Sequence, residues 1–393
     1  MAGGTAGSAA VSGQVADGWE SVRDAFAATV DGAPGGAAVG LVVAGRTVVD
    51  LWAGSAGSAG AAGAAARPWS RDTRALVLSA SKGLVALCVL HLVQSGRLDL
   101  DAPVAACWPE FAQHGKGTVT LREALAHRAG VPVVDAVHTR GQVLSWEVMA
   151  AGVASQVPLW PPGTAYQYHA LTYGWLAGEC LRRVAGRTPG RYLHDVFGAP
   201  LGLRTAIGVP VDEQSDIATV LPAPPADPAH PYSDPLGLDA RATSMNGALV
   251  FPGEGPRHDW NDPDVLAAEI PACNGVSSAR DLATLYAAVV GTGAGAGLIA
   301  DDVLRDALTV LSEGQDVAGD QSGPTPRWGA GIMAESAVRP MFGPTSFGHY
   351  GAGGQVAFGD IATRSGFAYV TSQLGGEGDT RANDVVAAAR RLL

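Results

Sequence analysis

Lysine is nearly absent from this chain of 393 residues, because only two of its 26 basic residues, Lys82 and Lys116, are lysines. Arginine stays protonated in proteins, whereas burial or a neighbouring cation can lower the pKa of a lysine until it acts as a base. A general bias of the chain toward arginine is the simplest explanation of the shortage. Against such a bias, a lysine indicates a position where arginine would not serve.

Charged residues are also scarce, at 16% of the chain, and their balance is acidic, with a formal net charge of −11. Nucleic acids and anionic membrane surfaces both bind clustered cations, so neither is an expected partner. The four cysteines form no Cys-x-x-Cys pair, which argues against a zinc cluster or a redox dithiol. We expect reduced, mostly buried thiols at Cys88, Cys107, Cys180 and Cys273.

Several other signals are missing. The first residues lack the basic and apolar regions of a secretory signal, and no apolar run is long enough to cross a bilayer. We therefore expect a cytoplasmic protein, although an unconventional export route stays open. No His-Glu-x-x-His motif occurs and the nine histidines are scattered, so neither a metal nor a cofactor is expected. The sequence contains no Gly-x-Ser-x-Gly motif, so an α/β-hydrolase fold is not supported.

Hydrophobic periodicity predicts helices along the whole chain and short strands near both of its ends. The expected helices include 19–30, 81–94, 146–155, 169–184, 278–290 and 380–393. The expected strands are 37–43, 47–52, 328–334, 347–350, 355–361 and 367–372.

This order of elements favours an α+β fold, in which an antiparallel sheet flanked by helices carries an inserted, mainly helical subdomain. Residues 1–13 are small and polar, and we expect a disordered leader there. The sheet subdomain would combine 14–96 with 270–393, and 97–269 would form the helical subdomain. Within the latter, 209–260 is rich in Pro, Asp and Gly, and a loop of this length is usually functional.

Ser79 and Lys82 stand at the start of the helix expected at 81–94. Side chains three residues apart lie on one face of a helix, with Cβ atoms about 5–6 Å apart. The hydroxyl would lie at the helix N-terminus, where free N–H groups favour the anion that forms when a serine attacks a carbonyl. A lysine with a lowered pKa could be the base that the serine needs. From these two residues alone, a helix-capping serine is the alternative.

Two further segments fit the same chemistry. The rigid turn Trp160-Pro161-Pro162-Gly163 precedes Tyr168 at the start of the next long helix. The segment 347–354, Phe-Gly-His-Tyr-Gly-Ala-Gly-Gly, reads as a strand whose backbone N–H groups stay uncovered for a ligand.

Three motifs thus follow one another along the chain: Ser79-Ala80-Ser81-Lys82, Tyr168-His169-Ala170 and His349-Tyr350-Gly351. With them the chain resembles the serine β-lactamase-like superfamily, class C type, and most closely its family VIII carboxylesterases. The resemblance extends from Trp19 to the C-terminus and implies a β-lactamase/transpeptidase-like fold. The distance from Pro162-Gly163 favours Tyr168 over Tyr166 as the tyrosine of the second motif.

The resemblance implies a role for each motif. Ser79 would attack the acyl carbonyl, while Lys82 and Tyr168 would share the acid–base duty, with a phenolate form of Tyr168 as one option. The N–H groups of Ser79 and Ala352 would form the oxyanion hole, and Gly351 would lie beside it.

Departures from the motifs narrow the expected substrate. Ala170 replaces the Asn with which β-lactamases hold the substrate amide, and His349 stands where they carry a lysine, near the leaving group. Both changes favour neutral esters over β-lactams. The role of His169 is open, while Trp260 could line the acyl pocket and Asn274 could support the site.

The resulting hypothesis is a serine hydrolase, a carboxylesterase that acts on small acyl esters. An acyltransferase of secondary metabolism would use the same residues, because only the nucleophile that reaches the acyl-enzyme differs. Ala170 and His349 disfavour a β-lactamase or D-Ala-D-Ala peptidase. The intact Ser79, Lys82 and Tyr168 disfavour a non-catalytic homologue. The sequence does not predict the oligomeric state.

Overall fold

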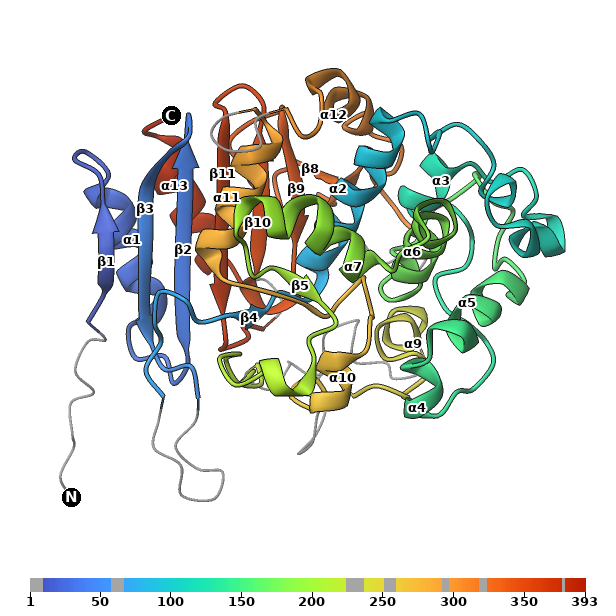
Figure 1. Ribbon diagram of the computed structural model, residues 1–393, viewed down its shortest axis with the longest axis horizontal. Helices are drawn as coiled ribbons and strands as arrows, with labels where there is room; N and C mark the ends of the chain where they lie inside the picture. Colours follow the sequence, from blue (N-terminus) through green and yellow to red (C-terminus); the bar gives the residue numbers. More distant parts are fainter. Residues whose placement is uncertain are drawn as a thin grey trace.

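Strands from the two ends of the chain meet in one antiparallel sheet, which forms the left side of the molecule in Figure 1. The computed structural model describes residues 10–57, 67–223, 237–250, 259–291, 297–317, 324–376 and 379–393. Within these ranges the strands lie in the order β1 (Ser12–Val15), β3 (Arg46–Gly54), β2 (Gly36–Val43), β11 (Ser365–Thr371), β10 (Val356–Asp360), β9 (Ser346–Tyr350), β8 (Met333–Ala334) and β7 (Arg327–Trp328).

The hairpin of β2 and β3 follows directly from local sequence. β2 is an almost unbroken apolar run and is buried along nearly its whole length. Ala44 and Gly45 join the two strands with φ of 47° and 77°. A two-residue type I′ turn needs two positive φ values of this kind, so the predicted hairpin is confirmed. β2 also pairs with β11, which brings the two ends of the chain side by side.

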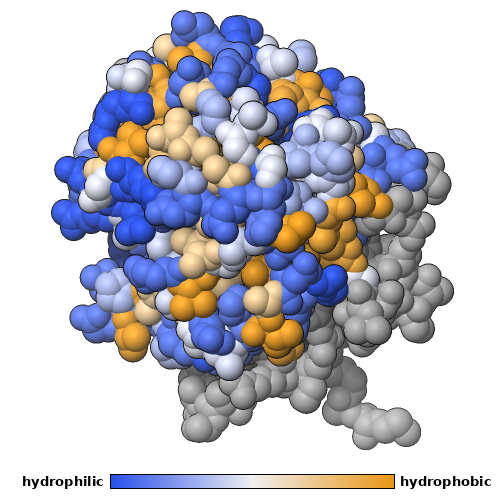
Figure 2. Space-filling model, turned by 90° about the vertical axis from the view of Figure 1, so that its right-hand side faces the viewer, coloured by the Kyte–Doolittle hydropathy of each residue, from blue (hydrophilic) through white to orange (hydrophobic). Residues whose placement is uncertain are grey.

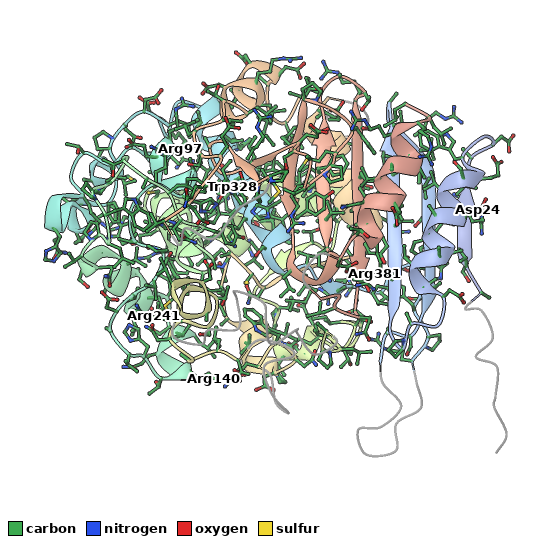
Figure 3. The ribbon with its side chains drawn as sticks, turned by 180° about the vertical axis from the view of Figure 1, so that it is seen from behind. Asp24, Arg97, Arg140, Arg241, Trp328 and Arg381 are labelled. Carbon is green, nitrogen blue, oxygen red and sulfur yellow. The ribbon has the colours of Figure 1, made fainter. Side chains whose placement is uncertain are left out.

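Helices cover both faces of the sheet: α1 (Glu20–Val30) and α13 (Arg381–Arg390) lie on one face, and α11 (Ala279–Val289) on the other. On the first face, the near one in Figure 3, the Phe26 and Tyr369 rings meet edge-on with centroids 6.3 Å apart. On the second face, a Cβ at Gly366 would stand 2.1 Å from the carbonyl oxygen of Ala283. A glycine in β11 is therefore required for α11 to pack this closely. The predicted α+β fold is confirmed.

The middle of the chain is mainly helical, and most of it lies on the right in Figure 1. Its helices are α3 (Leu121–Leu125), α4 (Arg140–Val143), α5 (Trp146–Ser155), α6 (Thr172–Ala185), α7 (Pro189–Leu193), α8 (Ala199–Leu201), α9 (Leu238–Ser244) and α10 (Pro263–Ala267). Figure 2 shows the outer end of this part, where hydrophilic residues dominate and apolar ones form small groups. None of the helices in the described ranges combines the length and apolar character of a membrane span.

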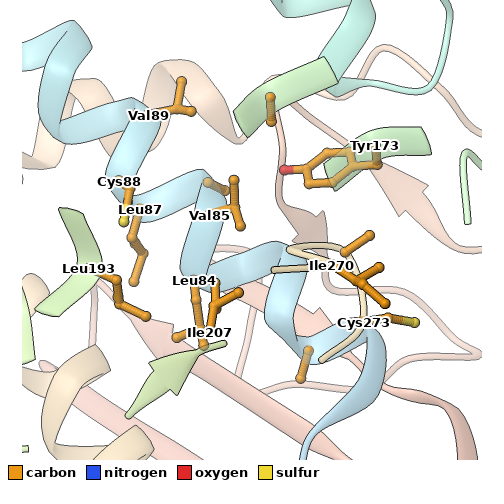
Figure 4. Packing of buried hydrophobic residues seen from close by; sticks show 14 of the residues in the cluster. Leu84, Val85, Leu87, Cys88, Val89, Tyr173, Leu193, Ile207, Ile270 and Cys273 are labelled. Carbon is orange, nitrogen blue, oxygen red and sulfur yellow. The ribbon is translucent and has the colours of Figure 1, made fainter. Parts of the chain in front are cut away.

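α2 (Ser81–Gln94) lies between the sheet and this helical part, and nearly all of its side chains are buried. Figure 4 shows Leu84 and Val85 of α2 within this packing, with Tyr173 of α6 facing the helix. The helix has the predicted bounds. It stops there because Gly96 adopts φ of 68°, the left-handed conformation that ends many helices.

Four further short elements belong to the described chain. α12 (Asp301–Ala307) follows α11, and a small sheet combines β4 (Ala75–Leu76), β6 (Gly275–Ser277) and β5 (Ala206–Ile207). β5 comes from the expected helical subdomain, yet it pairs with β6 of the expected sheet subdomain. The division of the chain at 96 and 269 stays a prediction.

The predicted leader extends too far. Ser12 and Gly13 belong to β1 and pair with Trp52 and Leu51 of β3. The short polar stretch 12–15 has no strand pattern in its sequence. It becomes a strand at the edge of the sheet because it pairs with β3. Residues 1–9 lie outside the described ranges.

The predicted loop 209–260 is not a continuous loop, because α9 lies within it. Its parts 224–236 and 251–258 lie outside the described ranges. The structure therefore does not test whether those parts cover the active site.

Two other predicted elements have different bounds. The helix expected from residue 169 begins at Thr172, because the backbone just before it contacts other side chains. The strand expected at 328–334 is a hairpin of β7 and β8. Gly331 in its turn has φ of 82°, which lets the chain reverse between the two short strands.

Candidate active site

A tight 3₁₀ turn, η1 (Leu78–Ala80), presents Ser79 immediately before α2. Leu78 has φ of 46°, a conformation that costs energy for a leucine and that recurs at functional sites. Ser81 fixes the turn, because its hydroxyl donates to the Leu78 carbonyl at 2.5 Å and accepts from the Gly275 N–H at 2.8 Å. Ser79 itself is partly exposed.

The side chain of Lys82 lies beside Ser79 and is completely buried. Its Nζ donates to Ser79 Oγ at 3.2 Å and to the carbonyl oxygens of Ala170 at 2.7 Å and Ala272 at 3.0 Å. These acceptors engage all three hydrogens of an ammonium group. Burial lowers the pKa of Lys82 from 10.5 to about 8, partly opposed by the Cys273 thiol. A fraction of Lys82 is therefore an uncharged amine at neutral pH.

Tyr168 also contacts Ser79. Its hydroxyl lies close enough to the Ser79 side chain to affect the pKa of the phenol, and Lys82 Nζ lies 4.7 Å from its ring centroid. The ring stacks on Trp328 with centroids 5.1 Å apart. Burial raises the pKa of Tyr168 above its usual value, although the neighbouring Ser79 side chain offsets part of this effect. The phenol keeps its proton at neutral pH, so the structure argues against a resting phenolate.

Tyr166 points elsewhere. Its hydroxyl donates to the carbonyl oxygen of Gly314 at 2.5 Å, and its ring is buried. Of the two tyrosines, Tyr168 is the one at Ser79.

The end of β9 lies alongside the serine turn. A Cβ on Gly351 would stand 2.4 Å from the Val77 carbonyl oxygen, so the approach requires glycine. Ala352 begins a 3₁₀ turn, where the first N–H groups have no partner within the turn. In η1, the turn that carries Ser79, the first hydrogen bond runs from the Ala80 N–H to the Val77 carbonyl at 3.1 Å. The N–H of Ser79, one residue earlier, therefore has no partner within the turn. The N–H groups of Ser79 and Ala352 stay the predicted donors of an oxyanion hole.

His349 lies in β9 with its ring in the same group of side chains. Its ring centroid is 6.2 Å from that of Tyr168 and 5.3 Å from that of Trp328. Nδ1 lies 2.5 Å from the Tyr350 carbonyl oxygen, so Nδ1 carries the hydrogen and Nε2 is an acceptor. Burial, with the charge of Lys82, holds the pKa of His349 well below its ordinary value. The ring is neutral, and Nε2 has no hydrogen-bond partner among the described residues.

A profile of the beta-lactamase family matches residues 22–391 of this sequence, which span both the serine turn and β9. The chain belongs to the beta-lactamase family. The predicted resemblance is thereby confirmed, and the protein is a serine hydrolase of this family with esterase relatives.

Relatives and solved structures agree with this assignment. Esterase/beta-lactamase LipL of Mycobacterium tuberculosis is 32% identical over 350 residues, covering 86% of this chain and 77% of LipL. The crystal structure of a family VIII carboxylesterase has a TM-score of 0.84 at 32% identity and covers 98% of this chain and 100% of that one. A penicillin-binding protein homologue from Caulobacter crescentus also has a TM-score of 0.84 at 32% identity. The match covers 98% of this chain and 100% of that one.

His169 of this beta-lactamase-family protein has a structural role. Its Nε2 accepts from the Val131 N–H at 3.3 Å, so its Nδ1 donates to the Gln167 carbonyl at 2.6 Å. Burial lowers the pKa of His169 to about 4, and the ring is neutral. Its backbone N–H donates to His127 Nδ1 at 3.1 Å, which holds the chain outside a helix until Thr172.

Asn274 supports the site indirectly, through backbone groups. The amide of Asn274 binds three backbone groups, the N–H of Ile270 and the carbonyls of Val265 and Ala268. It therefore braces the loop whose Ala272 carbonyl holds Lys82. Trp260 is 1% exposed and packs in the core, and its place in an acyl pocket stays a prediction. Among the described residues, no group of three His, Cys, Asp or Glu side chains could hold a metal ion.

Sequence reasoning missed three residues at the site: Cys273, Trp328 and His127. Burial raises the pKa of the Cys273 thiol, while the neighbouring Lys82 and Ser79 side chains oppose this shift. Trp328, labelled near the centre of Figure 3, lies where the sheet meets the helices. The His127 ring lies 4.8 Å from that of Tyr168, and its φ is 64°. Cys273 directly follows Ala272, whose carbonyl accepts from Lys82, whereas Trp328 has no local signal of a place in the site.

Proposed function

We propose that this protein is a carboxylesterase that hydrolyses small acyl esters through an acyl-enzyme on Ser79. The hydrogen bonds of Lys82 carry this proposal. Two of the three Lys82 Nζ contacts are to the carbonyl oxygens of Ala170 and Ala272, and the third is to Ser79 Oγ. Carbonyls can only accept, so a neutral Lys82 keeps its two remaining hydrogens on them. Its lone pair is then directed at the Ser79 hydroxyl.

Acylation follows from this arrangement. Ser79 Oγ bonds to the acyl carbon while its proton passes to Lys82. The N–H groups of Ser79 and Ala352 stabilise the negative charge on the carbonyl oxygen. The bond to the alcohol then breaks, and the alcohol takes a proton from Tyr168, which regains one from Lys82.

Deacylation uses the same groups with water as the nucleophile. Water bonds to the acyl carbon as its proton passes to the neutral Lys82. The bond between Ser79 Oγ and the acyl carbon breaks, Ser79 recovers a proton, and the carboxylic acid leaves. An acceptor alcohol in place of water would give acyl transfer from the same intermediate.

The surroundings of Ser79 favour neutral esters. The side chain of Ala170 offers no amide to a substrate, and a neutral His349 offers no positive charge to a substrate carboxylate. The name of the family VIII carboxylesterase supports the ester assignment. The name of LipL covers both esterase and beta-lactamase, and with the penicillin-binding protein homologue it makes β-lactams the alternative to test. A cytoplasmic location stays a prediction, which cell fractionation would test.

A fluorophosphonate probe and p-nitrophenyl esters of short acids test the proposal. We expect the probe to label Ser79, the esters to turn over, and Ser79→Ala to abolish both. Tyr168→Phe should lose about 10²–10⁴-fold in kcat/KM, as removal of an acid–base group does. Tyr166→Phe is its matched control and should retain activity. An unlabelled Ser79 in folded protein, or rapid nitrocefin turnover with poor ester hydrolysis, would contradict the proposal.

A further inference from the structure

Two of the four cysteines lie together in the helical part of the molecule. Cys107 follows the 3₁₀ turn η2 (Val104–Ala106) and is half-buried, while Cys180 lies in α6 and is fully buried. Each of these two side chains shifts the pKa of the other, so the sulfurs are neighbours, and the Cys107 thiol itself donates to the Val104 carbonyl at 3.3 Å. Both are reduced in this structure. The prediction of reduced, mostly buried thiols is confirmed, and Cys107 is the one of the four that is only half-buried.

A cavity of about 400 Å³ opens beside Cys107. Arg97, labelled in Figure 3, and Arg183 contribute to its lining together with Leu98 and Pro103. Arg97 follows the C-terminal end of α2, whereas Ser79 precedes its N-terminal end. A helix of 14 residues is about 20 Å long, so this cavity is separate from the active site.

The groups around Cys107 favour its thiolate. The neighbouring Cys180 thiol and the positive charge of Arg183 lower the pKa of Cys107, while burial and the Glu179 carboxylate oppose them. Arg183 is fixed beside the thiol by ion pairs with Glu110 at 2.8 Å and Glu179 at 2.7 Å. The same neighbouring pair raises the pKa of Cys180, which keeps its proton.

We propose that Cys107 is a site of oxidation by hydrogen peroxide and that Cys180 is its resolving thiol. Low-pKa thiols that solvent reaches and that lie beside a second thiol are the ones that oxidise reversibly. Cys107 combines these features with a cavity large enough for a peroxide. Cys88 lacks them, because it is fully buried and burial raises its pKa.

The chemistry balances without a further reactant. The Cys107 thiolate attacks one peroxide oxygen, the O–O bond breaks, and the departing hydroxide takes up the proton that Cys107 released. The resulting sulfenic acid reacts with the Cys180 thiol, so that an S–S bond forms, the S–O bond breaks and a second water leaves. Two thiols and one hydrogen peroxide thus give one disulfide and two waters.

Peptide mapping of peroxide-treated protein tests this proposal. The scarcity of lysine helps, because trypsin places Cys107 in 98–116, Cys180 in 141–182 and Cys88 in 83–97. We expect mass spectrometry to find the first two peptides joined after treatment and separated again by dithiothreitol. The folded wild-type protein suffices for this measurement.

Variants separate the two steps. In Cys180→Ser the reaction should stop at the sulfenic acid, which dimedone labels at Cys107, and Cys107→Ser should give neither product. Cys88→Ser is the matched control and should form the disulfide as the wild type does. Absence of the cross-link in the wild type would overturn the proposal. So would oxidation that falls on Cys88 or Cys273, or that ends as a sulfinic acid at Cys107.

Discussion

Lys82 and Lys116, the two lysines of the chain, are both buried, and burial lowers the pKa of each to about 8. Their contacts differ. Lys82 Nζ meets the Ser79 hydroxyl, whereas Lys116 Nζ donates to the Gln156 carbonyl at 2.6 Å and lies 5.2 Å from the Phe111 ring centroid. A lowered pKa alone does not identify a catalytic base; contact with the nucleophile distinguishes the two.

Replacing each lysine with methionine separates these roles. Lys82→Met should lower kcat/KM for a p-nitrophenyl ester by about 10²–10⁴-fold, because the variant lacks the base that takes the proton of Ser79. Lys116→Met removes a similar buried amine that no catalytic group contacts, so kcat/KM should stay near the wild-type value. Circular dichroism would verify that both variants fold. Equal losses of kcat/KM would contradict the assignment of Lys82 as the base.

The pH dependence of catalysis should report on Lys82. Only the neutral amine can accept a proton, so kcat/KM should fall about tenfold for each pH unit below the pKa of about 8 and level off above it. Burial keeps Tyr168 protonated and His349 neutral across this range. Initial rates at low substrate concentration would give the profile. If kcat/KM instead falls with a midpoint near the ordinary pKa of histidine, a group other than Lys82 controls the pH dependence.

At the scale of elements, the sequence predicts best where local chemistry decides. The helix 81–94 is a buried apolar run that ends at Ser95 and Gly96, and its bounds are those predicted. The two-residue turn at Ala44 and Gly45 determines how β2 pairs with β3 in the hairpin. The helix expected from residue 169 starts late because Lys82 and His127, which are remote in sequence, bind the backbone there.

At the active site, too, the sequence predicts local arrangements but not contacts between residues remote in the chain. Helical spacing places Ser79 beside Lys82, but the positions of Tyr168 and His349 came only from the family resemblance. The packing of Trp328 on Tyr168 depends on how β7 meets the helical part, which no local pattern encodes. The role of His169 was open from sequence, and its ring proves to bind backbone groups of Val131 and Gln167.

Gly351 tests how closely β9 must approach the serine turn. Its added Cβ would stand 2.4 Å from the Val77 carbonyl, so Gly351→Ala has to displace β9 or the turn. A misplacement of about 1 Å can cost about 10²-fold in rate, and we expect a loss of kcat/KM of that order. Gly343→Ala, just before β9, is the control, because its Cβ would meet nothing within 4 Å. Full activity of Gly351→Ala would show that the approach does not position the site.

At the scale of the whole molecule, the sheet separates two parts of the apolar core. One contains Val22 and Phe26 of α1 with Val385 of α13, and the other surrounds α2. In Figure 1, α1 lies at the far left and α2 near the centre, and Figure 3 shows α1 and α13 on the face turned to the viewer. The face with α1 should therefore contribute to stability without contacting the reacting groups.

Phe26→Ala tests this separation. Phe26 is fully buried against Tyr369, and truncating a buried aromatic costs about 3–5 kcal/mol of the free energy of unfolding. Urea unfolding followed by tryptophan fluorescence should show that loss, while kcat/KM of the folded variant without urea stays at the wild-type value. Asp24→Ala on the exposed side of the same helix should change stability by no more than about 0.5 kcal/mol. If Phe26→Ala lowers kcat/KM while still folded, α1 and the active site are coupled through the sheet.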